Sequence, residues 1–187
     1  MTGVQTCALP ISRVNTSFYQ STIPFSRGRI ILPGGNTGSL VTATTATGLD
    51  FYYDVTAVAE RVPNGDTVYS IGTTSGNRSA TVTNWNTDLV FPATSTTTTI
   101  VLKNMVMVSN TSLNLGSGCT GDSGGPWYQI TGPTTAKFAG IQSAVDTQVT
   151  STTRLDSVPA TCFTNSYFSP VAQIRIAYPN RVFQFTR

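Results

Sequence analysis

The chain has no histidine, although its 187 residues are enough for one or two small domains. Histidine is the side chain that most often transfers protons in enzymes near neutral pH, so its absence removes the usual general base. Charge is also scarce, because 10% of the residues are charged and the net charge is +3. The 11 basic residues never form a run of three, which excludes the basic surface of a nucleic-acid-binding protein.

Long apolar runs and helical patterns are missing as well. No stretch of 18 apolar residues occurs, so we expect no membrane-spanning segment. Leucine, glutamate and lysine at helical spacing are scarce, whereas the chain has 33 threonines, four of them in succession at residues 96–99. Because threonine, valine and aromatic residues favour strands, a mostly β protein is predicted. Low charge with many serines and threonines is typical of an extracellular protein.

The apolar residues that are present occur in short runs separated by turn residues. The first run, at residues 51–59, is aromatic and β-branched and ends before the turn residues Pro63, Asn64 and Gly65. Further strands are expected at residues 67–71, 78–83, 100–108, 127–130, 138–145 and 167–168, with a brief helix at 171–176. Six or seven short strands at regular spacing predict a closed barrel or a sandwich.

The first twelve residues, MTGVQTCALPIS, differ in character from the rest. They lack the basic start, the long apolar run and the small-residue cleavage site of a secretion signal. They resemble the in-frame translation of a widely used sequencing-library adapter, the alternative being a genuine short β-leader. We therefore leave residues 1–12 out of the fold as an artefactual leader and expect the gene to be cut at its 5′ end. Cys7 belongs to this leader.

Residues 119–126 read Cys-Thr-Gly-Asp-Ser-Gly-Gly-Pro. This octapeptide resembles the nucleophile loop of the trypsin/chymotrypsin-like serine proteases, and the chain is similar to their bacterial secreted members over residues 50–180. The similarity is strong at 119–127 and loose elsewhere. The segment 65–76 looks like the opening of the second of the family's two β-barrels, and no segment looks like the first.

The resemblance implies an all-β fold, namely the second six-stranded antiparallel barrel of the two-barrel chymotrypsin-like fold, with the first barrel missing. Residues 13–49 would then be a connector between barrels, and residues 50–187 the C-terminal barrel of a trypsin-like peptidase domain.

The same resemblance implies the roles of the loop. Ser123 would be the catalytic nucleophile, and the backbone N–H groups of Gly121 and Ser123 would form the oxyanion hole that stabilises the tetrahedral intermediate. Asp122 would be a structural support whose buried carboxylate pairs with a cation. In bacterial relatives an arginine commonly holds the position of Thr73, so Arg78 is our candidate substitute, a solvent-facing Arg78 being the alternative.

A specificity pocket and a disulfide follow from the resemblance too. Ser117 would form the pocket floor, and because no carboxylate stands there, an apolar or aromatic substrate side chain is expected. The pocket positions are Ser117, Gly118, Thr120, Ser143, Ala144, Val145 and Ser166. Cys119 and Cys162 would form a disulfide worth about 2–4 kcal/mol, the alternative being two free thiols. No cofactor and no metal are implied.

Two other assignments fit parts of the sequence. The sequence Gly121-Asp-Ser-Gly-Gly125 also fits the nucleophile elbow of α/β-hydrolases, but an elbow leads into a helix, whereas Pro126 and Trp127 lead into an expected strand. Asp50 and Asp54 are candidates for the triad acid. In the resembled family that acid precedes the second barrel, so we expect it, like the histidine, to lie outside this chain.

Three functions remain for comparison. The first, which we favour, is the C-terminal barrel of a secreted serine endopeptidase that acts on polypeptides, needs its missing N-terminal barrel and is inactive alone. The second is a complete pseudo-protease that serves as a binding module. The third is an unrelated threonine-rich β-sandwich that is adhesive or sugar-binding. An intact oxyanion loop argues against the third, and the small number of strands argues against the second.

Overall fold

The computed structural model describes residues 29–32, 51–72, 74–92, 99–111, 116–146, 148–153 and 159–180. The expected leader, most of the expected connector, Asp50 and Thr73 lie outside these ranges. In chain order the elements are β1 (Arg29–Leu32), β2 (Phe51–Val58), β3 (Thr67–Gly72), β4 (Gly76–Pro92), β5 (Thr99–Ser109), β6 (Gly118–Cys119), β7 (Pro126–Gly132), β8 (Thr135–Val145), β9 (Gln148–Thr153), β10 (Pro159–Phe163), β11 (Asn165–Pro170) and α1 (Val171–Ala177).

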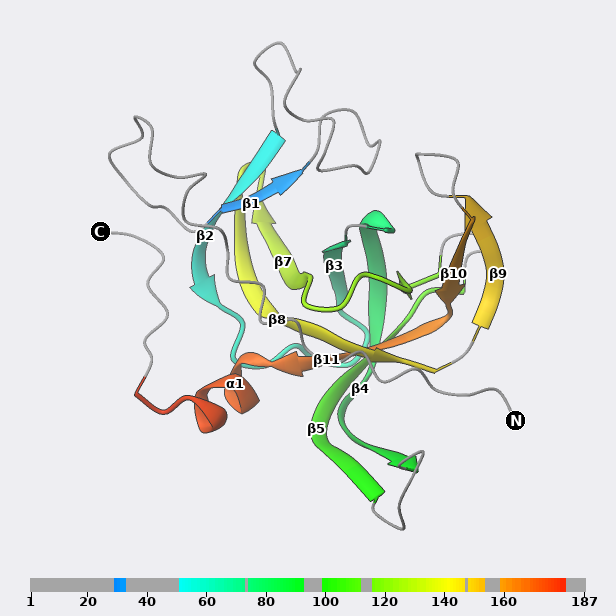
Figure 1. Cartoon of the computed structure of the whole chain (residues 1–187). Helices are drawn as coiled ribbons and strands as arrows, with labels where there is room; N and C mark the ends of the chain where they lie inside the picture. Colours follow the sequence, from blue (N-terminus) through cyan, green and yellow to red (C-terminus); the bar gives the residue numbers. More distant parts are fainter. Residues whose placement is uncertain are drawn as a thin grey trace.

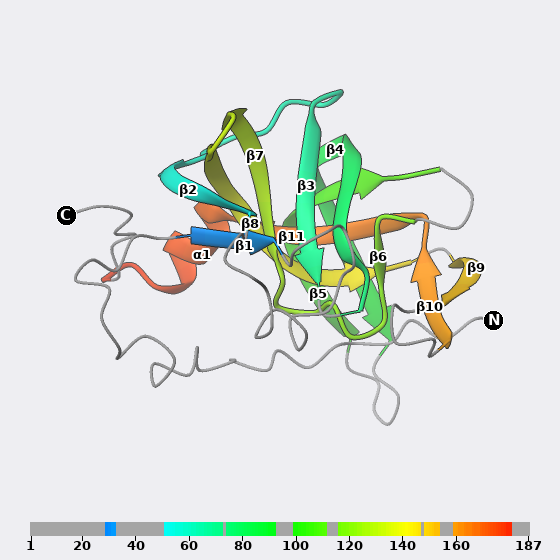
Figure 2. The ribbon, with the colours of Figure 1, turned by 90° about the horizontal axis from the view of Figure 1, so that it is seen from above.

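Six of the strands form a closed ring. The pairings run from β3 to β4, β5, β11, β8 and β7 and back to β3, and every one of them is antiparallel (Figure 1). Figure 2 shows the same strands wound about a common interior. Closure pairs each of these six strands on both sides over at least part of its length. The prediction of an all-β fold is confirmed.

The remaining strands attach to the outside of the ring. β2 pairs in parallel with the start of β8, and β1 pairs antiparallel with β2. A separate sheet has the order β6-β10-β9. The described helix α1 has seven residues and confirms the predicted brief helix. No helix among the described residues is long and apolar enough to cross a membrane.

β4 is much longer than the sequence predicts. The expected strand stops at residue 83, but the observed one continues to Pro92 and pairs with β5 throughout. The run after Thr83 begins with mostly polar residues, Asn-Trp-Asn-Thr-Asp at 84–88, so the predicted strand ends before them. Register shifts between Val82 and Asn84, and again near Thr87, let this run stay in the ladder. The outer part of the hairpin therefore projects away from the ring (Figure 1).

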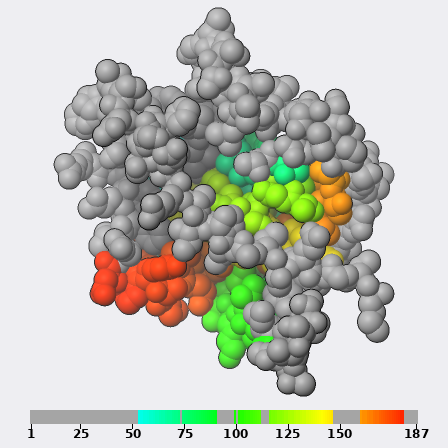
Figure 3. Space-filling model, viewed as in Figure 1, coloured from blue at the N-terminus to red at the C-terminus, as the bar shows by residue number. Residues whose placement is uncertain are grey.

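The main core lies inside the ring and takes a side chain from each of its strands. Its members from β3, β4, β5, β7, β8 and β11 include Val68, Ala80, Val106, Trp127, Ala139 and Phe168. The rings of Trp127 and Phe168 stack with their centroids 5.5 Å apart. In the space-filling view, α1 (red) and the hairpin of β4 and β5 (green) form the lower surface, and the β6–β7 region (yellow-green) is visible at the centre (Figure 3). The packed interior thus supports a surface loop between β6 and β7.

Candidate active site

The predicted nucleophile loop joins β6 to β7 and is tied to β8 by backbone hydrogen bonds. The N–H of Gly124 donates to the carbonyl of Gln142 at 3.0 Å, and the N–H of Gln142 donates to the carbonyl of Gly125 at 2.9 Å. Gly121 and Gly124 have φ values of +98° and +84°, which are left-handed conformations that favour glycine. The two glycines therefore allow the tight path that brings Ser123 to the surface.

Asp122 is held inside the protein by backbone amides. Its side chain is buried, at 5% exposure. Oδ1 accepts hydrogen bonds from the N–H groups of Thr74 (2.9 Å) and Ser75 (3.0 Å), and Oδ2 accepts one from Cys119 (2.7 Å). Three such bonds offset the cost of burying a carboxylate. The carboxylate thus anchors the loop to the turn between β3 and β4.

Arg78 lies near this carboxylate without forming an ion pair with it. Burial lowers the pKa of the Arg78 guanidinium, and the charge of Asp122 partly raises it again. Its Nε is buried and finds no hydrogen-bond partner among the described residues. The salt bridge that the described residues form lies elsewhere, between the exposed side chains of Arg175 and Glu60. The resemblance predicts a cation beside Asp122, but the Asp122 carboxylate is held mainly by main-chain N–H groups.

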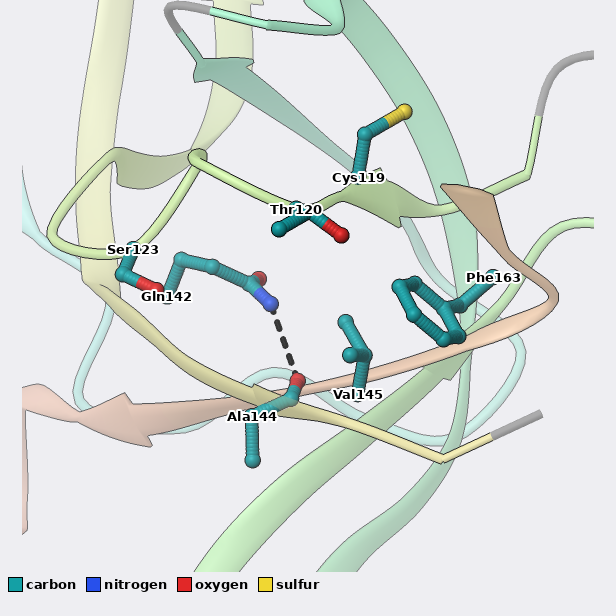
Figure 4. A pocket seen from close by; sticks show the side chains of 7 residues that line it. All are labelled: Cys119, Thr120, Ser123, Gln142, Ala144, Val145 and Phe163. Carbon is teal, nitrogen blue, oxygen red and sulfur yellow. Dashed lines mark hydrogen bonds between the residues drawn. The ribbon is translucent and has the colours of Figure 1, made fainter. Parts of the chain in front are cut away.

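Ser123 stands half-buried at the surface of the loop. Within the described ranges its hydroxyl and amide make no recorded hydrogen bond. Its side chain lines a pocket together with Cys119, Thr120, Gln142, Ala144, Val145 and Phe163 (Figure 4). The convergence of the Gly121 and Ser123 amides on an oxyanion stays a prediction.

The pocket beside Ser123 is narrow. Its free space is about 10 Å³, which matches a single water molecule. Of the predicted pocket residues, Thr120, Ala144 and Val145 line it. The others do not: Ser117 and Ser166 are fully buried, with their hydroxyls 2.8 Å apart, and Gly118 is buried beside them. Ser143, from the same strand as Ala144, bonds instead to the Ile141 carbonyl and to the hydroxyl of Ser169.

Gln142 is a pocket residue that sequence reasoning missed. Its side chain is buried at 4% exposure, and its amide group points toward the Ala144 carbonyl at the pocket (Figure 4). Oε1 accepts a hydrogen bond from the indole N–H of Trp127 at 2.6 Å, and Nε2 donates to the Ala144 carbonyl at 2.9 Å. A polar residue inside the apolar run 138–145 was the available signal, because buried amides need specific partners.

The predicted disulfide between Cys119 and Cys162 is confirmed. The two cysteines face each other in the antiparallel pair of β6 and β10. The bond therefore joins the start of the nucleophile loop to the strand that carries Phe163 at the pocket wall.

The structure does not bring Asp54 to this site. Asp54 pairs with Thr135 at the first residue of β8, whereas the pocket lies at the other end of that strand, at Ala144 and Val145. The backbone N–H of Asp54 donates to the Thr134 carbonyl at 2.8 Å. The backbone of Asp54 is thus part of the β2–β8 contact.

Comparisons with known proteins give one family match and several similar folds. The family model Trypsin matches residues 41–163. No curated protein matches the chain. The similar solved structures include a glutamic acid specific serine protease, with a TM-score of 0.47 at 19% identity over 86% of this chain and 61% of that one.

Two further structures of this kind have sequence identities near 20%. Cellulomonas bogoriensis chymotrypsin has a TM-score of 0.44 at 20% identity, with 73% of this chain and 58% of that chain covered. Nocardiopsis protease has a TM-score of 0.42 at 17% identity, with 68% and 53% covered. The chain thus spans between 53% and 61% of the length of the three structures.

Proposed function

Because this chain belongs to the trypsin family, we propose that it is the nucleophile-bearing part of a serine endopeptidase. One observation carries the proposal: a buried carboxylate, Asp122, braces through three main-chain N–H groups the loop that presents Ser123 beside a pocket. In this proposal the hydroxyl of Ser123 attacks the carbonyl carbon of a peptide bond. The amides of Gly121 and Ser123 stabilise the resulting oxyanion.

The chain does not carry the base that the reaction needs. A serine hydroxyl attacks only when a neighbouring group takes its proton, and in this family that group is an imidazole. The chain has no histidine. We propose that the 187 residues alone are inactive and that a histidine-bearing barrel outside them supplies the base. Residues 1–12 would be an artefactual leader, 13–49 the connector to that barrel, and 50–187 the C-terminal barrel.

The substrate in this proposal is an extended polypeptide. β7 pairs with β8 only as far as Ile141, and beyond it Ala144 and Val145 pair, among the described strands, with β11 alone. Such an edge suits a peptide that adds a strand by backbone hydrogen bonding. The disulfide and the low charge support a secreted protein. No metal or cofactor takes part in the proposed step.

Chemical rescue of the missing base tests the proposal. The purified chain is treated with a fluorophosphonate probe, with and without a high concentration of free imidazole. We expect negligible labelling without imidazole, slow labelling of Ser123 with it, and none in Ser123→Ala. Ser79→Ala, which changes an exposed serine, is the matched control and should label like the unchanged chain.

Two results would contradict parts of the proposal. Labelling without imidazole at the rate of an intact protease would overturn the predicted inactivity. Absence of labelling even with imidazole would overturn Ser123 as a poised nucleophile. The second outcome would favour the alternative function, a pseudo-protease that binds polypeptides without cleaving them, which the missing histidine supports.

A further inference from the structure

We propose that Gln142 determines the specificity of the pocket beside Ser123, and that it selects substrate side chains ending in a hydrogen-bond-accepting oxygen. This inference rests on the proposed peptidase function of the same pocket. It differs from the apolar or aromatic preference expected from the sequence, because a buried amide lines the observed pocket, whereas Ser117 does not.

The orientation of the Gln142 amide is determined by its two neighbours. The indole N–H of Trp127 is only a donor, so the amide oxygen must face it, as the 2.6 Å contact shows. The Ala144 carbonyl is only an acceptor, so the amide nitrogen must face it, at 2.9 Å. Exchanging the oxygen and the nitrogen would place donor against donor and acceptor against acceptor. The amide nitrogen is therefore held on the pocket side.

One hydrogen of this nitrogen remains available for a ligand. An amide nitrogen donates two hydrogen bonds, and the described residues accept one of them, at Ala144. A Cβ on Gly118 would lie 2.7 Å from the Ser166 hydroxyl, which is too close without a shift, and 3.6 Å from Nε2, which is an ordinary contact distance.

The size and charge of the pocket favour a small polar group over an aromatic ring. The free space matches one water molecule, so an accepting oxygen can replace such a water at the amide, and the walls must give way for the rest of any side chain, most of all for an aromatic ring. Its lining residues carry neither a cation nor a carboxylate. A lysine or arginine side chain would therefore find no counter-ion there. A neutral amide fits this lining best, and a carboxylate shares the same accepting oxygen.

A peptide series on the unchanged chain tests the inference without requiring catalysis. Acetylated tripeptides that differ only in the C-terminal residue are titrated into the chain, and the amide signals of residues 119–125 are followed by NMR. We expect the glutamine peptide to bind roughly tenfold more tightly than the methionine peptide, which has similar length but lacks the oxygen. A glutamate peptide distinguishes a carboxylate from a neutral amide, and a phenylalanine peptide tests the aromatic alternative.

A matched pair of variants supports the assignment to one residue. Gln142→Met removes the donor at similar volume and should abolish the preference for glutamine over methionine. Gln129→Met changes a glutamine on β7 that bonds to Asp66 outside the pocket and should leave the preference unchanged. If Gln142→Met does not fold, because Trp127 loses its acceptor, the peptide series on the unchanged chain decides alone.

Each outcome decides the inference. Tightest binding of glutamine or of glutamate supports it and identifies the accepting group as an amide or a carboxylate. Equal or tighter binding of methionine or phenylalanine overturns the role of Gln142 and leaves the proposed peptidase intact. If no peptide perturbs the signals of residues 119–125, the proposed substrate site itself fails, and this inference fails with it.

Discussion

The nucleophile loop and the outer hairpin differ in where they place polar and apolar side chains. We define the outer hairpin as residues 87–92 of β4 and 99–104 of β5. In the loop, a carboxylate is buried and accepts three main-chain hydrogen bonds. In the outer hairpin, Val90 and Val101 are opposite each other in the ladder and are 62% and 43% exposed. A buried charge is uncommon and needs compensating partners, whereas single exposed apolar side chains are ordinary and need none.

Each region also contains an aspartate whose carboxylate accepts hydrogen bonds from backbone N–H groups, so the two aspartates can be compared directly. Asp88 in the outer hairpin is exposed and accepts a single bond, from the N–H of Asn104 at 2.9 Å. Asp122 in the loop is buried and accepts hydrogen bonds from the N–H groups of Thr74 and Cys119, which are far from each other in the sequence. A bond that water can replace contributes little, whereas an unpaired buried group is costly. The two regions should therefore respond very differently to the same chemical change.

The largest effect is expected for Asp122→Asn. The new amide nitrogen would face an N–H donor, either that of Cys119 or those of Thr74 and Ser75, and would leave it unpaired. We expect a loss of about 3 kcal/mol in the free energy of unfolding, measured by urea denaturation. Asp88→Asn is the matched control and should cost less than about 0.5 kcal/mol. Equal losses in the two variants would show that burial does not distinguish these aspartates.

The second effect concerns the disulfide that closes the loop region. Replacing Cys119 and Cys162 by serine removes a cross-link between residues 43 apart in the sequence. We expect a loss of about 2–4 kcal/mol, because the unfolded chain becomes freer. The measurement is urea denaturation in a Cys7→Ser background, which excludes thiol exchange. Reducing the parent protein should produce a loss of the same size, and no loss on reduction would contradict the prediction.

A third change disturbs the carboxylate without altering its charge. A Cβ at Gly72 would lie 2.1 Å from Oδ1 of Asp122, so Gly72→Ala forces the anchor to move. We expect a cost of about 1–3 kcal/mol from overpacking, together with altered NMR signals at Ser123. Gly65→Ala separates contact from backbone strain, because Gly65 has φ +92° and no neighbour within 4 Å. If only Gly65→Ala destabilises the protein, the contact at Asp122 is unimportant.

A fourth effect appears at alkaline pH, on the strand that follows the loop. Burial, and then the neighbours Tyr53 and Tyr69, raise the pKa of Tyr128 in the folded protein. The unfolded tyrosine loses its proton near pH 10, so stability should fall as the pH rises above about 10. Tyr128→Phe should make this fall shallower by up to about 1.4 kcal/mol per pH unit. Urea denaturation between pH 8 and 11 measures it, and the exposed Tyr178→Phe should leave the slope unchanged.

The smallest effect is expected at the outer hairpin. Val90→Thr and Val101→Thr replace exposed apolar side chains with residues that also favour strands. We expect each to change the free energy of unfolding by less than about 0.5 kcal/mol, measured by urea denaturation. A loss above about 1 kcal/mol would mean that this surface is covered when the protein is folded, and the contrast with the loop would disappear.

Local chemistry explains why parts of the fold were predictable. The disulfide partners were the two cysteines outside the leader, and the resemblance of residues 119–126 identified the loop. The extent of β4 was not predictable, because residues 84–88, which are mostly polar, stay in the ladder only through register shifts against β5. The role of Gln142 was missed for a similar reason, since its partner Trp127 lies on another strand.

The sequence by itself determined the all-β character, the identity of the proposed nucleophile and the lack of an imidazole to activate it, because these depend on residue types and short spacings. Only the tertiary structure decided what supports Asp122 and what closes the pocket. Thr74 lies 48 residues from Asp122, and Gln142 reaches the loop across paired strands. Such contacts arise from closure of the ring, which brings together groups that no local pattern connects.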